Sequence, residues 1–225
     1  MIRRLVIAPH VDDDVLGCGG ILDAETVTFY CGVDEFHVVT REQRYWEAKA
    51  VIDRTGGRMW WPEEGLERSG AFSPSGPVTA YRTARVVNHY DIPSLIADFE
   101  TVISEEKPDE AFLPWPSFNQ DHRAVYEAAL VALRPHDRNW FVPRVLVYEG
   151  SQINFWDHAT PGVQFQPNYF VPIDIDEKIG LYEFMPSQYR SFRSFAHLRA
   201  LATLRGGEIG AAHAEAFQIL RWVGE

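Results

Sequence analysis

Short apolar runs alternate with helical patterns along the first two thirds of the sequence, and this order leaves few folds open to the chain. The apolar run 5–8 stops at Pro9, and the run 26–31 is rich in β-branched and aromatic residues, so both predict strands. A helical pattern follows from Thr40, a suitable N-cap, to Gly56. Strands that alternate with helices form right-handed βαβ units, so we expect a Rossmann-like α/β fold: a mainly parallel sheet flanked by helices. The other predicted elements of this part are strands at 58–61, 111–113 and 144–148 and helices at 93–106 and 121–133.

Two parts of the chain are less regular. From 62 to 91, proline, glycine and serine recur with little periodicity, which predicts either a long functional loop or a disordered segment. As a functional loop, it would cover the substrate site as a lid. At the other end, 211–222 is predicted to be a last helix that packs Phe217, Leu220 and Trp222 inward. No repeat, low-complexity tract or linker interrupts the chain, which predicts a single domain over residues 1–225. The remaining predicted elements are a strand at 169–173 and helices at 177–185 and 195–204.

Composition excludes several kinds of protein. The 225 residues are 46% hydrophobic, which is enough for a full core, and the net charge of −11 repels phosphate polyanions. We therefore expect no binding to a nucleic-acid polymer. No apolar run approaches the roughly 18 residues of a membrane span, and the apolar run at the start is too short for a signal peptide. Two cysteines, Cys18 and Cys31, cannot form a disulfide framework, so the cytoplasm is the expected location.

The most informative segment is 8–20, Ala-Pro-His-Val-Asp-Asp-Asp-Val-Leu-Gly-Cys-Gly-Gly, which begins where the first strand ends. Ligands of open α/β sheets bind outside the carboxyl ends of the strands, so the position itself suggests a site. His10 and the three carboxylates 12–14 lie within five residues. Adjacent like charges repel, and a divalent metal would neutralise them while using them as ligands. An Asp-rich turn that is only solvated, or in which Asp14 caps a helix, is the alternative interpretation.

Three glycines close this segment. Gly17, Gly19 and Gly20 predict a close approach of a substrate or metal to the backbone, since no side chain stands in the way. A phosphate-binding loop is the competing explanation. The spacing is not that of a dinucleotide- or nucleotide-binding loop, however, and the neighbouring carboxylates would repel a phosphate.

A second polar cluster, 114–122, follows a strand much later in the chain and reads Pro-Trp-Pro-Ser-Phe-Asn-Gln-Asp-His. In a parallel sheet this strand end faces the same side as the first one, so His122 can meet His10 and one of the aspartates. Two imidazoles, one carboxylate and an open position are typical of a catalytic metal site. Asp121 would orient a ligating histidine, although a capped helix start would also explain Asp121 and His122.

The two clusters together are similar to the motifs of the PIG-L/LmbE-type zinc N-deacetylases. The segment 9–20 resembles their signature His-Pro-Asp-Asp-Glu…Leu-Gly-x-Gly-Gly, and 119–122 resembles His-x-Asp-His. The first motif is highly specific and the second is a partial match. Weaker matches occur in the same order along nearly the whole chain: Arg44, Glu47-Ala48, Tyr148-Glu149, Lys178, Ser187-Gln188 and Glu215-Ala216-Phe217.

The resemblance implies roles for individual residues. It implies that His10, Asp13 and His122 hold the metal, zinc or alternatively iron(II). It also implies that Asp12 is the general base and that Asp121 supports a histidine. Asn119 replaces the first histidine of the second motif; it can donate a hydrogen bond to an oxyanion but cannot deliver a proton.

The resemblance also implies the reaction. We expect a hydrolase that removes an N-acyl group, most often N-acetyl, from a small molecule containing an amino sugar, by metal-activated water with Asp12 as base. Asp12 then both accepts and returns the proton. A homo-oligomer is compatible with the sequence. Four residues are candidates for substrate binding: Arg44, Arg82 and Arg85, whose guanidinium groups would meet an anionic or polar group, and Trp115, which would stack on a sugar ring.

Two other functions remain open at this point. A non-haem iron oxygenase also uses two histidines and one carboxylate, although such triads commonly lie on all-β barrels. A non-catalytic metal- or sugar-binding module on the same fold is the second alternative, because Asn119 removes one catalytic side chain and a fold does not fix an activity.

Overall fold

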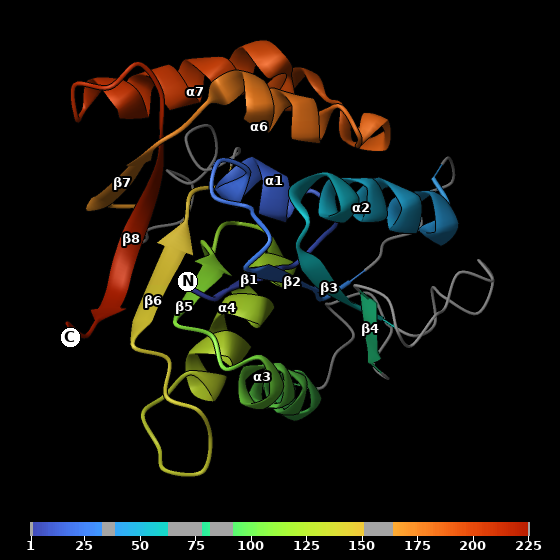
Figure 1. Ribbon diagram of the computed structural model, residues 1–225, viewed down its shortest axis with the longest axis vertical. Helices are drawn as coiled ribbons and strands as arrows, with labels where there is room; N and C mark the ends of the chain where they lie inside the picture. The colour runs from blue at the N-terminus through green and yellow to red at the C-terminus, as the bar shows by residue number, and fades with distance from the viewer. Residues whose placement is uncertain (1, 33–38, 63–77, 82–91, 151–163, 225) are drawn as a thin grey trace.

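The computed structural model describes residues 2–32, 39–62, 78–81, 92–150 and 164–224. Eight strands form one sheet in the order β4-β3-β2-β1-β5-β6-β8-β7 (Figure 1). The first six in sequence pair in parallel, whereas β8 is antiparallel to both of its neighbours. The bounds are β1 Arg4–Ala8, β2 Thr26–Tyr30, β3 Arg58–Pro62, β4 Val78–Tyr81, β5 Glu110–Pro114, β6 Arg144–Tyr148, β7 Tyr169–Pro172 and β8 Ala214–Trp222.

Helices cover both faces of the sheet, as Figure 1 shows. The helices α3 (Ile92–Glu106) and α4 (Gln120–Ala132) lie on one face, where their apolar side chains share a core with β1, β2 and β5. The other face carries α1 (Asp13–Cys18), α2 (Arg41–Thr55), α6 (Ile175–Tyr182) and α7 (Phe195–Gly207), which enclose a second core. This arrangement confirms the predicted α/β fold with a mainly parallel sheet flanked by helices.

Local signals explain several helix boundaries. Thr40 caps α2 by accepting a hydrogen bond from Gln43 N at 3.1 Å, and Gly56 ends the helix in the left-handed conformation with φ 75°. Asn119 caps α4 and Asp174 caps α6 in the same way. None of the helices within the described ranges is long and apolar enough to cross a membrane.

The predicted last helix at 211–222 is wrong, because Ala214–Trp222 forms β8. Its residues 214–217 are all buried, since the strand lies between β6 and β7 and packs on both faces there. The three-residue spacing of Phe217 and Leu220 favours a helix, but in the strand Phe217 is buried, whereas Leu220 and Trp222 are exposed. A second difference is β4, which lies inside the segment predicted to be an irregular loop; residues 63–77 and 82–91 lie outside the described residues.

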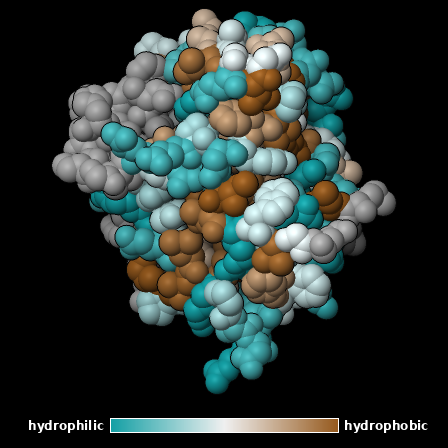
Figure 2. Space-filling model, turned by 90° about the vertical axis from the view of Figure 1, so that its left-hand side faces the viewer, coloured by the Kyte–Doolittle hydropathy of each residue, from teal (hydrophilic) through white to brown (hydrophobic). Residues whose placement is uncertain are grey.

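Seen from the side of β7 and β8, the surface carries apolar patches between polar side chains (Figure 2). At the end of β8, Leu220, Trp222 and Val223 are exposed, and the guanidinium of Arg144 lies over the Trp222 ring at 5.4 Å from its centroid. The stacking covers part of the apolar ring with a cation.

Candidate metal centre

The two polar motifs meet at the place where the chain order of the sheet reverses. β1 lies between β2 and β5, so the chain leaves β1 toward one side of the sheet and later returns on the other. In open α/β sheets this switch point is the usual ligand crevice. His10 follows the end of β1, and His122 lies in the first turn of α4, after β5. Their ring centroids are 5.4 Å apart. The convergence that the sequence predicted is therefore present.

Asp13 lies between the two imidazoles. Its Oδ2 atom is 3.3 Å from Nδ1 of His10 and 3.2 Å from Nε2 of His122, and it accepts a hydrogen bond from the backbone N–H of His10 at 3.0 Å. One potential ligand atom from each of His10, Asp13 and His122 lies within 4.8 Å of the other two. The three side chains are 10–18% exposed, so the cluster is largely but not completely screened from bulk water.

The charge state of Asp13 follows from this geometry. Burial alone would raise the pKa of its carboxyl, but the charge and hydrogen bonds of His122 and His10 outweigh burial and hold that pKa well below its usual range. Asp13 is therefore ionised at neutral pH, as a metal ligand must be.

Asp121 contacts His10, not its sequence neighbour His122. Oδ2 of Asp121 lies 2.9 Å from Nε2 of His10, on the ring nitrogen opposite the one that faces Asp13. A carboxylate in this position fixes the tautomer and orientation of a ligating imidazole. The expected orienting role thus has a specific geometry, and it links the second motif to the first.

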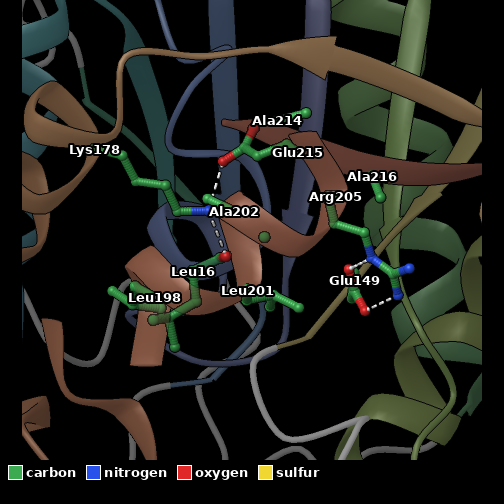
Figure 3. Close-up of a pocket in the computed structure, with 11 residues that line it drawn as sticks. Leu16, Glu149, Lys178, Leu198, Leu201, Ala202, Arg205, Ala214, Glu215 and Ala216 are labelled. Carbon is green, nitrogen blue, oxygen red and sulfur yellow. Dashed lines mark hydrogen bonds and ion pairs between the residues drawn. The ribbon is translucent and has the colours of Figure 1, made fainter. Parts of the chain in front are cut away.

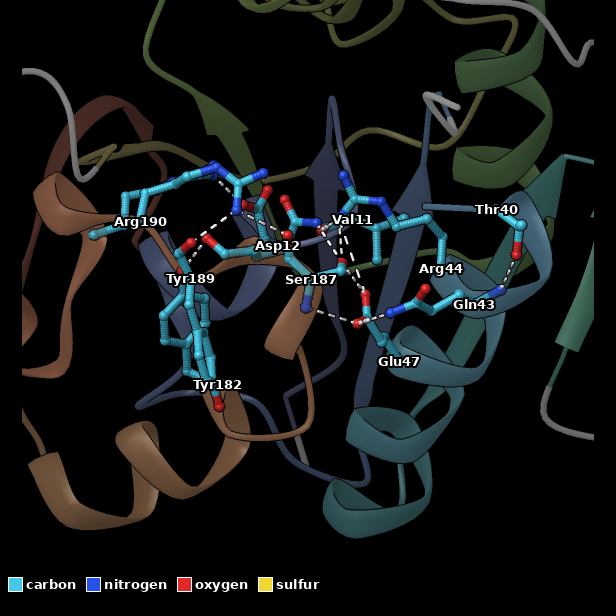
Figure 4. A network of polar contacts seen from close by, with 12 residues as sticks. Val11, Asp12, Thr40, Gln43, Arg44, Glu47, Tyr182, Ser187, Tyr189 and Arg190 are labelled. Atoms are coloured by element: carbon cyan, nitrogen blue, oxygen red, sulfur yellow. Dashed lines mark hydrogen bonds and ion pairs between the residues drawn. The ribbon is translucent and has the colours of Figure 1, made fainter. Parts of the chain in front are cut away.

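Asp12 contacts a basic residue that sequence reasoning missed, and Figure 4 shows the polar network around it. Its Oδ2 atom forms an ion pair with Nη1 of Arg193, from the 3₁₀ helix Ser191–Arg193. Burial raises the pKa of Asp12 to about 6, against the opposing effect of the Arg193 charge. Arg193 lies in an irregular segment without a recognisable motif, so no sequence signal marked it as part of the site.

Asp14 is fully buried and turns toward the core. Tyr30 donates its hydroxyl proton to Oδ2 of Asp14 at 2.6 Å. Burial raises the pKa of Asp14 to about 7, and the hydrogen bond from Tyr30 partly offsets that rise. The three consecutive aspartates therefore have different partners: Asp13 contacts the two histidines, Asp12 pairs with Arg193, and Asp14 accepts a hydrogen bond from Tyr30 of β2.

Arg44 belongs to a network beside Asp12 (Figure 4). It donates hydrogen bonds to the Val11 carbonyl at 3.4 Å and to the Ser187 hydroxyl at 3.3 Å. Ser187 in turn donates its hydroxyl proton to Glu47 at 2.5 Å. These contacts tie α2 and the segment 186–193 to the loop that carries Asp12, which places Arg44 within the wall of the site.

The other predicted site residues fall in different surroundings. The side-chain oxygen of Asn119 accepts a hydrogen bond from Asp121 N at 2.8 Å, so it caps α4. Trp115 is 7% exposed and packs in the core, where its ring centroid lies 5.3 Å from that of Phe165 in an edge-to-face contact, which leaves little of its ring for a sugar. Arg82 and Arg85 lie outside the described residues.

The glycines of the first motif serve packing rather than ligand approach. A Cβ atom on Gly17 would lie 2.2 Å from the Tyr148 ring, and one on Gly20 would lie 2.3 Å from the side chain of Ile173. On Gly19 it would lie 3.0 Å from the Lys178 side chain. The predicted role of these glycines is therefore corrected: they let β6 and α6 approach the short helix α1.

Comparison with known proteins supports this architecture. No protein-family model and no curated protein matches the sequence. Among solved structures, N,N'-diacetylchitobiose deacetylase from Pyrococcus horikoshii matches with a TM-score of 0.69 and 18% identity over 97% of this chain and 84% of that chain. The chain has the fold of this enzyme. Teicoplanin deacetylase Orf2 in its zinc-inhibited form matches with a TM-score of 0.62 and 19% identity over 99% of this chain and all of the other.

The same fold also carries a different reaction. GalB, the 4-carboxy-2-hydroxymuconate hydratase of Pseudomonas putida KT2440, matches with a TM-score of 0.69 and 16% identity over 100% of this chain and 99% of that chain. The expected likeness to PIG-L/LmbE-type deacetylases is confirmed for the fold. The reaction has to be argued from the site.

Proposed function

We propose that this chain is a metal-dependent hydrolase that removes an N-acyl group, most simply acetyl, from a small molecule containing an amino sugar. The observation that carries the proposal is the convergence of His10, Asp13 and His122 from two distant segments. The deacetylases that share the fold agree with it.

The three side chains fit a catalytic zinc ion. Two imidazole nitrogens and one ionised carboxylate form a zinc donor set, and three protein ligands leave a position for a substrate or water. Asp121 on the far nitrogen of His10 supplies the orienting carboxylate that such ligands usually have. Iron(II) accepts the same donor set and remains the alternative metal. Such an ion supplies Lewis acidity, which lowers the pKa of a bound water toward ~7 and polarises an amide carbonyl.

The proton transfers fall to Asp12 in this proposal. It is adjacent to Asp13 in sequence, and Arg193 holds its carboxylate in place. Asp12 takes a proton from the attacking water and returns it to the departing amine. Asn119 cannot do so, because its amide donates hydrogen bonds but does not act as a general acid. The oxygen of Asn119 caps α4, so the NH₂ group is the part that can donate to the oxyanion. Loss of such a donor typically lowers the rate by ~10²–10³.

Arg44 is the proposed substrate contact among the described residues, because it lines the site beside Asp12. The roles of Arg82, Arg85 and Trp115 in substrate binding, a cytoplasmic location and a homo-oligomer stay predictions, as does a single domain over 1–225.

Metal analysis of the purified protein tests the metal site. Wild type should hold stoichiometric zinc or iron, Asp13→Ala should hold little, and Asp53→Ala, an exposed aspartate of α2, should match wild type. A wild-type protein that retains no divalent metal after loading would refute the site.

An activity screen tests the reaction. Metal-loaded protein is incubated with N-acetyl amino sugars and their nucleotide conjugates, and release of amine and acetate is measured. Asp12→Ala should keep its metal and lose turnover. A panel in which no member yields amine would contradict the hydrolase, and tight sugar binding without turnover would indicate a non-catalytic module. The oxygenase alternative predicts oxygen consumption with 2-oxoglutarate, and the parallel α/β fold speaks against it.

A metal-dependent hydratase is the second candidate, because GalB shares the fold to the same TM-score as the chitobiose deacetylase. Asn119 is compatible with it, since addition of water to a double bond releases no amine that must be protonated. Loss of the absorbance of an unsaturated dicarboxylic acid, without amine release from any sugar, would favour the hydratase.

A further inference from the structure

A buried ion pair on the far side of α1 has no part in the proposed chemistry. Lys178 from α6 and Glu215 from β8 have side chains only 7% and 4% exposed, and Nζ of Lys178 lies 2.6 Å from Oε1 of Glu215. The pair lines a cavity with Leu16 and Ala202, and a second buried pair, Arg205 with Glu149, lines it as well (Figure 3).

The cavity itself does not explain the pair. Its volume is about 20 Å³, which suits a single water molecule and no organic ligand. Both cations already bind carboxylates. The contacts of the pair with α1 are the more informative feature.

Lys178 and Glu215 take the place of a backbone hydrogen bond. In α1, Gly19 N donates to Val15 O at 3.0 Å, and the next bond of the helix would join Gly20 N to Leu16 O. Instead, Lys178 donates to Leu16 O at 2.8 Å and Gly20 N donates to Glu215 Oε1 at 2.9 Å. The ion pair thus supplies partners for the Leu16 carbonyl and the Gly20 N–H, which the end of the helix leaves without each other.

This attachment matters because α1 is too short to be stable by itself. It has six residues, with Asp13 at its first position and Asp12 as the residue before it. An isolated helix of this length does not form in water, so contacts with the rest of the fold must hold it. Glu215 lies in the sheet, in register with Val171 of β7, and therefore offers a rigid anchor.

A buried ion pair is also an unusual way to gain stability alone. Removing two charges from water costs several kcal/mol, and well-packed apolar side chains often serve the fold equally well. What apolar side chains cannot do is bind a carbonyl and an amide in one defined geometry. The pair fixes the position of α1, whereas apolar contacts would only keep it packed.

We propose that Lys178 and Glu215 are positioning residues for the metal centre, which hold the C-terminal end of α1 to α6 and β8 so that Asp12 and Asp13 at its other end stay in place. Neither residue touches the cluster of His10, Asp13 and His122. They act through the helix that carries two of the functional carboxylates.

Hydrogen exchange and zinc affinity of matched variants test this proposal; the zinc arm rests on the proposed function and the exchange arm does not. Glu215→Leu removes the acceptor for Gly20 N, whereas Glu215→Gln keeps an oxygen there. Glu110→Leu is the control, because Glu110 is equally buried and ion-paired with Arg4 and Arg144 at the opposite ends of the strands. Lys178→Met is the second variant, for use if Glu215→Leu does not fold. It removes the donor to the Leu16 carbonyl and keeps the hydrogen bond from Gly20 N to Glu215.

In chelator-treated protein, we expect the peptide 12–20 to exchange at least about tenfold faster in Glu215→Leu or Lys178→Met than in wild type. Glu215→Gln should restore most of the protection, and Glu110→Leu should leave this peptide unchanged. The zinc dissociation constant should rise about tenfold in the same two variants, the lower end of the range for residues that support metal ligands. Unchanged exchange at 12–20, or an equal rise in exchange throughout the chain, overturns the positioning role. If wild type binds no zinc, the proposed function fails while the exchange result still decides this proposal.

Discussion

Replacing Gly17 with alanine should destabilise the protein far more than one methyl group suggests. The new Cβ atom would lie 2.2 Å from Cδ2 and 2.8 Å from Cε2 and Cγ of Tyr148. Ordinary contact begins at 3.4 Å, so Cδ2 must move away by at least 3.4 − 2.2 = 1.2 Å. Tyr148 is 1% exposed, and its hydroxyl donates to the Ile7 carbonyl at 2.9 Å. The ring therefore cannot move without disturbing β1, the strand that leads to His10.

The magnitude follows from two terms. Overpacking of a core costs ~1–3 kcal/mol, and breaking the Tyr148 hydrogen bond leaves the buried Ile7 carbonyl without its donor, at a further ~1–3 kcal/mol. The two costs together come to ~2–6 kcal/mol. For a chain of this size each kcal/mol lowers Tm by about 2–4 °C, so we expect Gly17→Ala to lower Tm by roughly 4–24 °C. The assay is thermal unfolding of the metal-free protein.

The control is Gly180→Ala in α6, where a Cβ atom meets nothing within 4 Å. Alanine in a helix interior should stabilise by about 0.5–1 kcal/mol. Combining Gly17→Ala with Tyr148→Leu tests the cause, because the alanine should cost little once the ring is gone. A Gly17→Ala protein as stable as wild type, or costs that simply add in the double variant, would refute the reasoning.

Three further predictions concern the site. Asp121→Ala should weaken zinc binding about 10–100-fold, because His10 loses its orienting carboxylate. Competition with a chromophoric chelator measures the affinity, and an unchanged value would contradict the orienting role of Asp121. Tyr30→Phe should lower the free energy of unfolding by ~1–3 kcal/mol in denaturant titrations, since buried Asp14 loses the hydroxyl that donates to it. Adding zinc at 100 times its dissociation constant should stabilise the apoprotein by about 2.7 kcal/mol, and the same addition to Asp13→Ala should have no comparable effect.

The parts of the site that sequence could predict are those set by chain order in a parallel sheet. His10 and His122 follow strands that βαβ connections place side by side, so their meeting is a consequence of topology. The helix boundaries marked by Thr40 and Gly56 were equally accessible, because cap and left-handed turn are local properties. These two helix boundaries depend only on neighbouring residues.

What could not be predicted depends on contacts between distant segments. Arg193 pairs with Asp12 although it is 181 positions away in the chain, and no sequence motif surrounds it. Asp121 contacts His10 rather than the neighbouring His122, because successive residues of a helix point in different directions. The glycines of the first motif carry the same lesson: their absent side chains make room for Tyr148 and Lys178, whose positions only the fold determines.

At position 119, capping of α4 and donation of a proton favour different side chains. Asparagine is among the best N-cap residues, and here its oxygen binds Asp121 N and so fixes the first turn of α4, which carries both Asp121 and His122. Histidine is not a favoured cap. The departure from the His-x-Asp-His pattern thus strengthens the placement of the second motif while removing a proton donor. If the reaction is amide hydrolysis, the leaving amine loses the proton donor that a histidine would supply at position 119. Asp12, which pairs with Arg193, then has to protonate that amine.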